Sequence, residues 1–172
     1  MIRKGNKYSR PRKPYESGRI KEENVLLEKY GLKNKKEIWK TIAKVNYFRR
    51  RAMALARSSS EEQEVLFNKL RGLGLKVNTI ADILALTTES LLERRLPTVV
   101  HKKGFASTVK AARQMVVHKR ISINDRVVNA PSYLVYVNEE NAIKVAKAKQ
   151  RKPKESAAEP AAPAVEVNEV KE

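Results

Sequence analysis

Basic side chains are the residues of this sequence whose types and spacing could do chemistry. Arg49, Arg50 and Arg51 stand in a row, and no acidic residue between Thr41 and Ser60 could pair with them. On a helix, like charges repel one another unless an anion lies opposite them. A guanidinium offers paired N–H donors that match the oxygens of a phosphate. The run therefore favours phosphate contact over a helix face that is merely solvated.

A second set of basic and polar residues occupies the stretch from residue 94 to residue 120. If residues 109–118 form a helix, Val109, Ala112 and Val116 fall on one side of it, and Lys110 and Arg113 fall on the other. Such a helix packs its apolar side on a core and turns a positive side to solvent. We expect contacts to nucleic acid from Arg94, Arg95, Lys102, Lys103, Ser107, Thr108, Lys110, Arg113, Gln114, His118, Lys119 and Arg120.

The residue types in this stretch indicate different roles. Lysine and arginine suit phosphates, and arginine can also fork to two oxygens or stack on a base. We expect phosphate contact at Lys102, Lys103, Lys110, Arg113 and Lys119. Hydroxyl and amide groups could instead hydrogen-bond to the sugar or backbone, provided that helix capping does not occupy the hydroxyls; these groups belong to Ser107, Thr108 and Gln114.

The first twenty residues are a third basic stretch. Proline restricts the residue before it to extended conformations, so Pro11 and Pro14 predict an arm rather than a helix. A solvated arm and an arm that tracks RNA both fit this pattern, and the net charge favours the second. The groups suited to phosphates and bases are Arg10, Arg12 and Lys13, with Tyr8 and Tyr15.

No arrangement of residues indicates catalysis or metal binding. His101 and His118 are 17 residues apart, and neither has a further metal ligand nearby. Asp82 and Asp125 are the only aspartates, and they fall in a predicted helix and a predicted turn. The sequence has no cysteine, which excludes disulfides, thiolate metal sites and cysteine nucleophiles. We expect neither an enzyme nor a cofactor, a metal ion or a small-molecule substrate.

Composition points to a polyanionic partner. The 172 residues include 37 Lys and Arg against 19 Asp and Glu, a formal net charge of +18. A surplus of this size cannot be neutralised within the chain, so the partner is nucleic acid or an anionic membrane. No apolar run approaches the roughly 18 residues of a membrane span, and the basic N-terminus lacks the apolar region of a secretory signal. We therefore expect a soluble, intracellular protein that binds a polyanion.

The distribution of charge divides the chain into four segments. Residues 1–57 hold 18 of the basic residues and 5 of the acidic ones. The end of the chain is a mixture of Ala, Pro, Glu and Val without aromatic residues or helical period, which is typical of disorder. We predict a basic arm at 1–20, a helical scaffold at 21–89, a small mixed domain at 90–150 and a disordered tail at 151–172.

Helical periodicity dominates the scaffold. A short helix is expected over residues 22–30, ended by Gly31. A capping box of Asn34 and Glu37 predicts the start of a long helix with an apolar stripe. The polar face of this helix carries Lys40, Lys44, Arg50, Arg51 and Arg57.

Three more helical stretches follow. Ser60 and Gln63 indicate a capped helix, and a shorter helix is expected over residues 79–86. The next stretch, residues 91–103, contains Pro97. Proline lacks the N–H that a helix interior needs, so this stretch is either kinked at Pro97 or restarted with Pro97 in the first turn.

A turn and short strands complete the mixed domain. Gly104 ends the preceding helix, and Phe105 can pack back across that end in a Schellman-type stop. Alternating residues predict a hairpin over residues 121–128, whose turn type is left open because type I′ favours Gly at the position of Asp125. A third strand is predicted over residues 133–137. The predicted class is α+β and mostly helical: a helical N-terminal domain, then two helices on a short antiparallel sheet, then a disordered tail.

Several short motifs are distinctive. Within the mixed domain they are Leu91-Leu92-Glu93-Arg94-Arg95-Leu96, Gly104-Phe105, Ala112-Arg113-Gln114, His118-Lys119 and Asn124-Asp125-Arg126-Val127-Val128-Asn129. Outside it they are Arg12-Lys13-Pro14-Tyr15-Glu16 and the run from Glu28 to Trp39. Together, over roughly residues 8–145, the sequence resembles the S4 family of small-subunit ribosomal proteins, in its archaeal and eukaryotic branch, with its S4 RNA-binding domain.

The resemblance implies a structural protein that binds small-subunit rRNA directly and nucleates assembly of the 5′ domain. Such a protein lies near the place where mRNA enters the subunit and contributes to decoding accuracy. The implied partners are small-subunit rRNA, neighbouring ribosomal proteins and mRNA, and the implied location is the cytoplasmic ribosome. Several bacterial members have a cysteine-based zinc site, which this chain cannot form.

Three alternatives remain open at this point. The first is an RNA-modifying enzyme that carries an S4 domain, which would need a catalytic domain that residues 1–85 are too small and too featureless to supply. The second is an assembly or rescue factor with the same domain, although such factors usually lack the N-terminal motifs. The third is a general polyanion-binding architectural protein, which would bind duplex DNA as well as structured RNA.

Overall fold

The structure, a computed structural model, describes residues 6 and 8–146. The predicted α+β, mostly helical class is confirmed, and the predicted tail at 151–172 lies outside the described residues. In chain order the elements are α1 (Ser17–Lys29), α2 (Lys35–Leu55), α3 (Ser60–Gly72), α4 (Ile80–Ala85), α5 (Thr88–Glu93), α6 (Leu96–Lys102), α7 (Val109–Val117), β1 (Ile121–Ile123), β2 (Arg126–Val127), α8 (Val137–Glu140) and β3 (Ile143–Val145).

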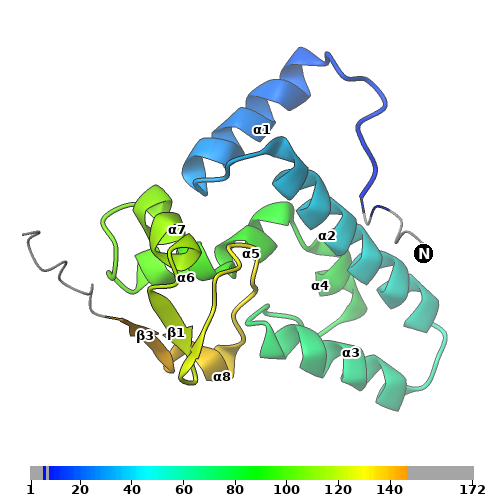
Figure 1. Cartoon of the computed structure of the whole chain (residues 1–172). Helices are drawn as coiled ribbons and strands as arrows, with labels where there is room; N and C mark the ends of the chain where they lie inside the picture. Colours follow the sequence, from blue (N-terminus) through cyan, green and yellow to red (C-terminus); the bar gives the residue numbers. More distant parts are fainter. Residues whose placement is uncertain (1–5, 7, 147–172) are drawn as a thin grey trace, which may run out of the picture.

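The elements form two lobes (Figure 1). The N-terminal lobe is built around the long helix α2, which packs against α1, α3, α4 and α5. The C-terminal lobe consists of α6 and α7, packed on each other beside an antiparallel sheet of strand order β2-β1-β3. Helix α5 lies between the lobes and contacts both α2 and α6.

Each lobe has its own hydrophobic core, and a third cluster packs α5 against α2 and the connection between α1 and α2. The N-terminal core gathers residues of α2 to α5, including Phe48 and Leu70. The C-terminal core surrounds Val100 and Ile121. The third cluster brings Leu92 of α5 against the α1–α2 connection and α2, at Tyr30, Leu32 and Ile38. Burial of apolar area is the main stabilising contribution to such packing, so the third cluster fixes α5, which contacts α6 of the C-terminal lobe, to α1 and α2.

Helix α1 begins at Ser17, earlier than the predicted residue 22. Arg19 lies in the additional turn and donates a hydrogen bond of 2.6 Å to Glu23. It also donates to the carbonyl oxygens of Lys13 and Pro14, at 3.0 and 2.9 Å. These contacts tie the first turn to the arm and the helix, a stabilisation that apolar periodicity does not reveal.

Glu23 fixes α1 against α2. Its buried carboxylate accepts a hydrogen bond of 2.9 Å from the Trp39 indole and lies 3.4 Å from the Lys35 amine. Burial raises the pKa of Glu23, but the hydrogen bonds from Trp39 and Arg19 outweigh burial and hold the pKa below its ordinary value. The carboxylate is therefore an ionised anchor between the two helices.

Two of the predicted caps differ from the structure. Asn34 accepts a hydrogen bond from the Lys36 amide and caps α2, but Glu37 does not complete a capping box, because its carboxylate binds the C-terminal lobe. The residue before α3 is Ser59 and not Ser60, and it makes no side-chain cap. Gln63 instead donates to carbonyl oxygens at the end of α2 and just after it.

The helix predicted over residues 91–103 is interrupted, and its second part restarts with Pro97 in the first turn of α6. Proline suits this position because an N–H there has no partner within the helix. At the other end, Gly104 has a φ of +76°. The Phe105 amide donates to Val100 and the Gly104 amide to His101, at 3.2 and 2.9 Å. This pattern confirms the predicted Schellman stop.

The hairpin is confirmed, and its turn type is now defined. Strands β1 and β2 pair antiparallel, with Ser122 opposite Val127. Between them, Asn124 and Asp125 have φ values of 48° and 62°. A type I′ turn requires positive φ at both central residues, so Asp125 adopts the conformation for which glycine is more common.

The prediction of a third strand at residues 133–137 was wrong. Leu134 forms one isolated bridge, with Arg95, and the third strand of the sheet is β3. Residues 133–135 run beside the α5–α6 connection, and α8 begins directly after them. Two backbone hydrogen bonds, of 2.9 and 3.0 Å, hold this segment there by joining Leu96 to Tyr133 and Val135 to Arg94.

Candidate nucleic-acid interface

A groove of about 1240 Å³ runs between α2 and the C-terminal lobe. Six basic side chains and one acidic side chain, Glu37, line it. Four of the basic residues and one aromatic residue come from α2 at spacings of three or four, which places them on one face of the helix. The basic residues are Lys36, Lys40, Lys44, Arg50, Arg95 and Arg113, and the aromatic residue is Tyr47.

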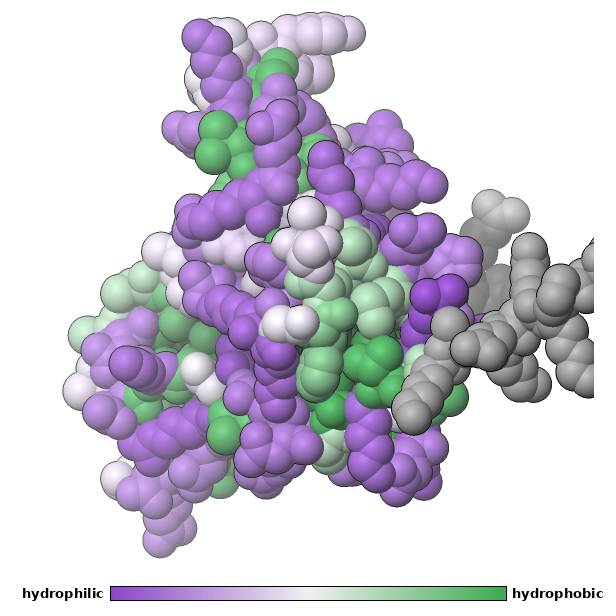
Figure 2. Space-filling view, turned by 90° about the vertical axis from the view of Figure 1, so that its left-hand side faces the viewer, coloured by the Kyte–Doolittle hydropathy of each residue, from purple (hydrophilic) through white to green (hydrophobic). Residues whose placement is uncertain are grey.

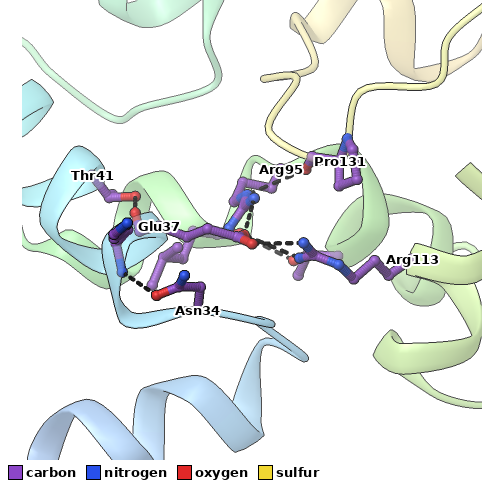
Figure 3. A network of polar contacts seen from close by, with 9 residues as sticks. Asn34, Glu37, Thr41, Arg95, Arg113 and Pro131 are labelled. Carbon is purple, nitrogen blue, oxygen red and sulfur yellow. Dashed lines mark hydrogen bonds and ion pairs between the residues drawn. The ribbon is translucent and has the colours of Figure 1, made fainter. Parts of the chain in front are cut away.

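Glu37 joins the two sides of this groove (Figure 3). Its carboxylate accepts hydrogen bonds of 2.6 and 3.0 Å from Arg113 of α7 and one of 2.6 Å from Arg95, which precedes α6. Arg95 is 5% exposed and also donates to the carbonyl oxygen of Pro131, at 3.3 Å. Three segments that are far apart in the sequence therefore meet at one carboxylate.

The charges of this cluster are mutually stabilising. Burial raises the pKa of Glu37, but the hydrogen bonds and charges of Arg113 and Arg95 more than compensate and hold the pKa below its ordinary value. Glu37 is thus ionised, and the cluster keeps one net positive charge. Both guanidiniums are held in fixed positions along the groove.

The structure brings only part of the Arg49–Arg51 run to this groove. Arg50 lines it, whereas Arg49 is half-buried and donates a hydrogen bond of 2.7 Å to the carbonyl oxygen of Leu86. Arg51 is exposed and donates to the hydroxyl of Tyr47, at 3.3 Å. Consecutive residues on a helix point in different directions, so three adjacent arginines cannot share one surface.

Several predicted contact residues have partners within the chain. Arg94 pairs with Glu140 and donates to the carbonyl oxygen of Val135, Lys102 pairs with Glu93 at 3.0 Å, and Lys103 donates to the carbonyl oxygen of Glu140. The Thr108 hydroxyl accepts a hydrogen bond from the Ala111 amide and caps α7. Helix capping therefore occupies this hydroxyl, which was one of the groups expected to bond to the sugar or backbone of a nucleic acid. These side chains support the lobe whether or not they also contact a ligand.

An exposed polar edge continues from the groove along α7. Arg113 of α7 lines the groove, and the exposed residues around it lie on the outer side of the helix, as the periodicity predicted. Figure 2 shows the face that includes this lobe, where hydrophilic residues cover most of the surface and apolar areas are smaller. The exposed residues along and beside the edge are Ser107, Lys110, Gln114, His118, Lys119 and Arg120.

The predicted arm residues Arg10, Arg12 and Lys13 are exposed. Arg10 lines a smaller pocket, of about 350 Å³, between the arm, α1 and α2. Tyr8 packs on Trp39 with 6.2 Å between the ring centroids, and the Lys40 amine lies 5.9 Å from the Tyr8 ring. The start of the described chain therefore lies alongside the groove.

The sequence reasoning missed several residues of the groove, and three of these are charged or aromatic. Lys36 continues the spacing of Lys40 and Lys44 by one turn toward the N-terminus, a signal that could have identified it. Tyr47 follows the same face. The role of Glu37 had no such signal, because its partners are 58 and 76 positions away.

Within the described residues no helix is long and apolar enough to cross a membrane. In the same part of the chain, no group of three or more His, Cys, Asp or Glu side chains is placed to hold a metal ion.

Comparison with known proteins identifies the family. A family model described as the S4 domain matches residues 94–141. The protein called small ribosomal subunit protein uS4 from Methanothermobacter thermautotrophicus is 47% identical over 143 residues, which cover 80% of this chain and 84% of that protein. The protein of the same name from Methanococcus aeolicus is 46% identical, with 79% and 81% covered.

The protein of that name from Methanococcus vannielii is 45% identical over 148 residues, with 82% and 83% covered. The similarity thus extends well beyond the S4 domain and includes the helical N-terminal lobe. The chain belongs to the small ribosomal subunit protein uS4 family, which is structural and not enzymatic.

Proposed function

We propose that this protein is a structural constituent of the small ribosomal subunit that binds small-subunit rRNA directly through the groove and the α7 edge. The observation that carries the proposal is the lining of the groove, with six cations and one carboxylate contributed by both lobes. Side chains are excluded from the deep groove of an RNA helix, so recognition relies on phosphates, 2′-hydroxyls and shape. A rigid surface of spaced lysines and arginines meets that requirement.

We infer a finer role from the family resemblance. Direct binding of this kind would nucleate assembly of the 5′ domain and place the protein near the point where mRNA enters the subunit, with an effect on decoding accuracy. The partners would be rRNA, neighbouring ribosomal proteins and mRNA, on ribosomes of the cytoplasm. Support for these roles comes from the family membership.

A competition titration tests the proposal. Labelled 5′-domain rRNA is bound to the full chain at two salt concentrations and challenged with unrelated structured RNA and with duplex DNA. A specific binder keeps its preference for 5′-domain rRNA at high salt, whereas purely electrostatic attraction binds all three alike and is lost as salt rises. Equal competition by the three would leave a general polyanion binder and overturn the proposal.

Two double variants of lysine test whether the groove is the surface that binds rRNA. Lys36 and Lys40 line the groove, whereas Lys69 and Lys76 are exposed and do not line it. Replacing Lys36 and Lys40 together by Ala should reduce the slope of log K against log salt by about 1.5, because each lost phosphate contact removes roughly 0.7–0.9 from it. The Lys69 and Lys76 double variant changes charge equally and should leave the slope nearly unchanged. Similar slopes for both double variants would place the interface elsewhere.

A further inference from the structure

We propose that Tyr47 is a stacking platform in the groove that takes the base of an unpaired nucleotide, while the α2 cations hold the backbone beside it. This inference rests on the proposed function, because the nucleotide would belong to the bound rRNA. It adds a requirement for an unpaired base, which electrostatic attraction to phosphates does not impose. The groove would recognise a looped-out or single-stranded residue, as well as the backbone of paired RNA.

The exposure of Tyr47 is the first argument. Its side chain is 49% exposed, although it lies on the helix that organises the N-terminal core. The next residue, Phe48, is buried in that core, and its ring centroid is 5.7 Å from that of Tyr47 at an interplanar angle of 59°. Phe48 therefore packs against the Tyr47 ring, while much of the tyrosine side chain remains accessible from the groove.

The surroundings of the ring are the second argument. Lys44 and Arg50 line the groove one turn before and one turn after Tyr47. Arg51 donates a hydrogen bond of 3.3 Å to the tyrosine hydroxyl, which restrains the outer end of the ring. An aromatic face between cations is the combination by which proteins hold single-stranded nucleic acid, with bases stacked on rings and phosphates on lysines and arginines.

Tyr8 provides a contrast within the same groove. Its ring packs against Trp39, and the Lys40 amine lies over it, so its faces contribute to the fold of the arm. Tyr47 is the more accessible of the two tyrosines. A base within a duplex is stacked on its neighbours and has no free face for a tyrosine, so the platform requires an unpaired base.

The test measures binding of the full chain to three probes: the 5′-domain rRNA, a single-stranded oligoadenylate of twelve nucleotides and a twelve-base-pair RNA duplex. Tyr47→Ala should weaken binding to oligoadenylate about 5- to 150-fold, the range for one lost base–aromatic stack. Binding to the duplex should change less than about twofold. Tyr47→Phe keeps the π face and should bind oligoadenylate within about threefold of the original protein.

Two further variants separate stacking from general disruption. Tyr47→Leu keeps apolar bulk without a π system and should bind as weakly as Tyr47→Ala. Met53, on the same helix, is 64% exposed and does not line the groove. Met53→Ala should therefore bind all probes as the original protein does, and matching circular dichroism melts for all variants would show that each is folded.

Photochemical cross-linking identifies the RNA base that contacts Tyr47. When single uridines of the 5′-domain rRNA are replaced by 5-iodouridine, irradiation should cross-link one unpaired position to the tryptic peptide that contains Tyr47. That adduct should be absent from Tyr47→Leu. Unchanged oligoadenylate binding by Tyr47→Ala, or an equal loss on the duplex, would overturn the platform. If the original protein itself failed to prefer 5′-domain rRNA, the proposed function would fail instead.

Discussion

At the scale of single residues, Glu37 is the side chain that joins helix α2 to the C-terminal lobe. It is the acidic residue of the groove, and it holds Arg95 and Arg113 by three hydrogen bonds of 2.6–3.0 Å. Without its charge, two guanidiniums would face each other across a partly buried site. The carboxylate in this basic groove therefore positions the two guanidiniums in addition to reducing the net charge of the cluster.

Replacement of Glu37 by Gln should destabilise the protein by about 2 kcal/mol, the scale of a hydrogen bond to a charged group. Urea unfolding at neutral pH measures the change. The matched control is Glu28→Gln, because Glu28 is exposed and outside the ion pairs of the described residues. The control should stay within about 0.5 kcal/mol of the original protein. Equal midpoints for the two variants would contradict a stabilising role for Glu37.

The stability difference between the original protein and Glu37→Gln should also depend on pH. The folded-state pKa of Glu37 lies below its ordinary value of 4.5. A carboxylate with a lowered folded pKa contributes stability that is present above the unfolded pKa and is lost as the pH falls through the folded pKa. The difference in unfolding free energy between the original protein and Glu37→Gln should therefore be constant above about pH 5.5 and shrink below pH 4.5. A difference that persisted at pH 2 would require another cause.

At the scale of elements, the connection after α3 is held by close packing against Arg94. Gly74 has a φ of +76°, and a Cβ placed on it would lie 2.6 Å from the Arg94 guanidinium carbon. Arg94 in turn pairs with Glu140 of α8. The end of α3, the end of α5 and α8 are thus locked together at a position where a side chain has no room.

Two glycine-to-alanine replacements test this packing. Gly74→Ala should destabilise the protein by more than about 1–2 kcal/mol, the cost of the left-handed conformation alone, because the Arg94–Glu140 pair must also move. Gly18 is in α1 and has no neighbouring atom within 4 Å of a built Cβ. Gly18→Ala should stabilise by roughly 0.5–1 kcal/mol, since alanine is the better helix former. Thermal melts of both variants measure the effects, and equal shifts would refute the packing argument.

At the scale of the whole molecule, the two lobes form one surface because they are fixed to each other. The cluster of Tyr30, Leu32, Ile38 and Leu92 fixes α5, which contacts α6, to α1 and α2, and the ion pairs of Glu37 with Arg95 and Arg113 join α2 to the C-terminal lobe. A groove whose walls belong to different lobes keeps its shape only if the joint is rigid. We therefore expect the described chain to unfold as one cooperative unit.

Leu92 allows a test of this cooperativity. Fluorescence of Trp39, the single tryptophan, reports on the α1–α2 contact, and far-ultraviolet circular dichroism reports on all helices. In urea the two transitions should coincide. Leu92→Ala removes a fully buried side chain and should shift both by the same amount, about 3 kcal/mol. The half-exposed Leu84 is the control, since Leu84→Ala should cost less than about 1 kcal/mol. Two separate transitions in the original protein would mean that the lobes unfold independently.

Much of this architecture was accessible from local patterns. The long helix, the interruption at Pro97, the Gly104 stop and the hairpin depend on interactions between residues a few positions apart, and all four agree with the structure. The outward face of α7 followed from its period in the same way. Family membership was likewise carried by short motifs.

The failures have a common physical origin. Residues 133–137 have the composition of a strand, but the Tyr133 carbonyl oxygen and the Val135 amide bond to the α5–α6 connection, and the strand that pairs with β1 is β3. Glu37 matches a capping box, yet two arginines offer its carboxylate a stronger partner than its own helix end. In both cases a non-local contact outweighed a local preference.

The amino-acid sequence by itself therefore determined the charge, most of the helices, their stops and the kind of partner this protein can have, because each depends on composition or on neighbours along the chain. Only the tertiary structure decided which cations line one groove, which support the fold, and where an accessible tyrosine stands among them. Those outcomes depend on how the lobes pack, since packing brings together residues that are tens of positions apart.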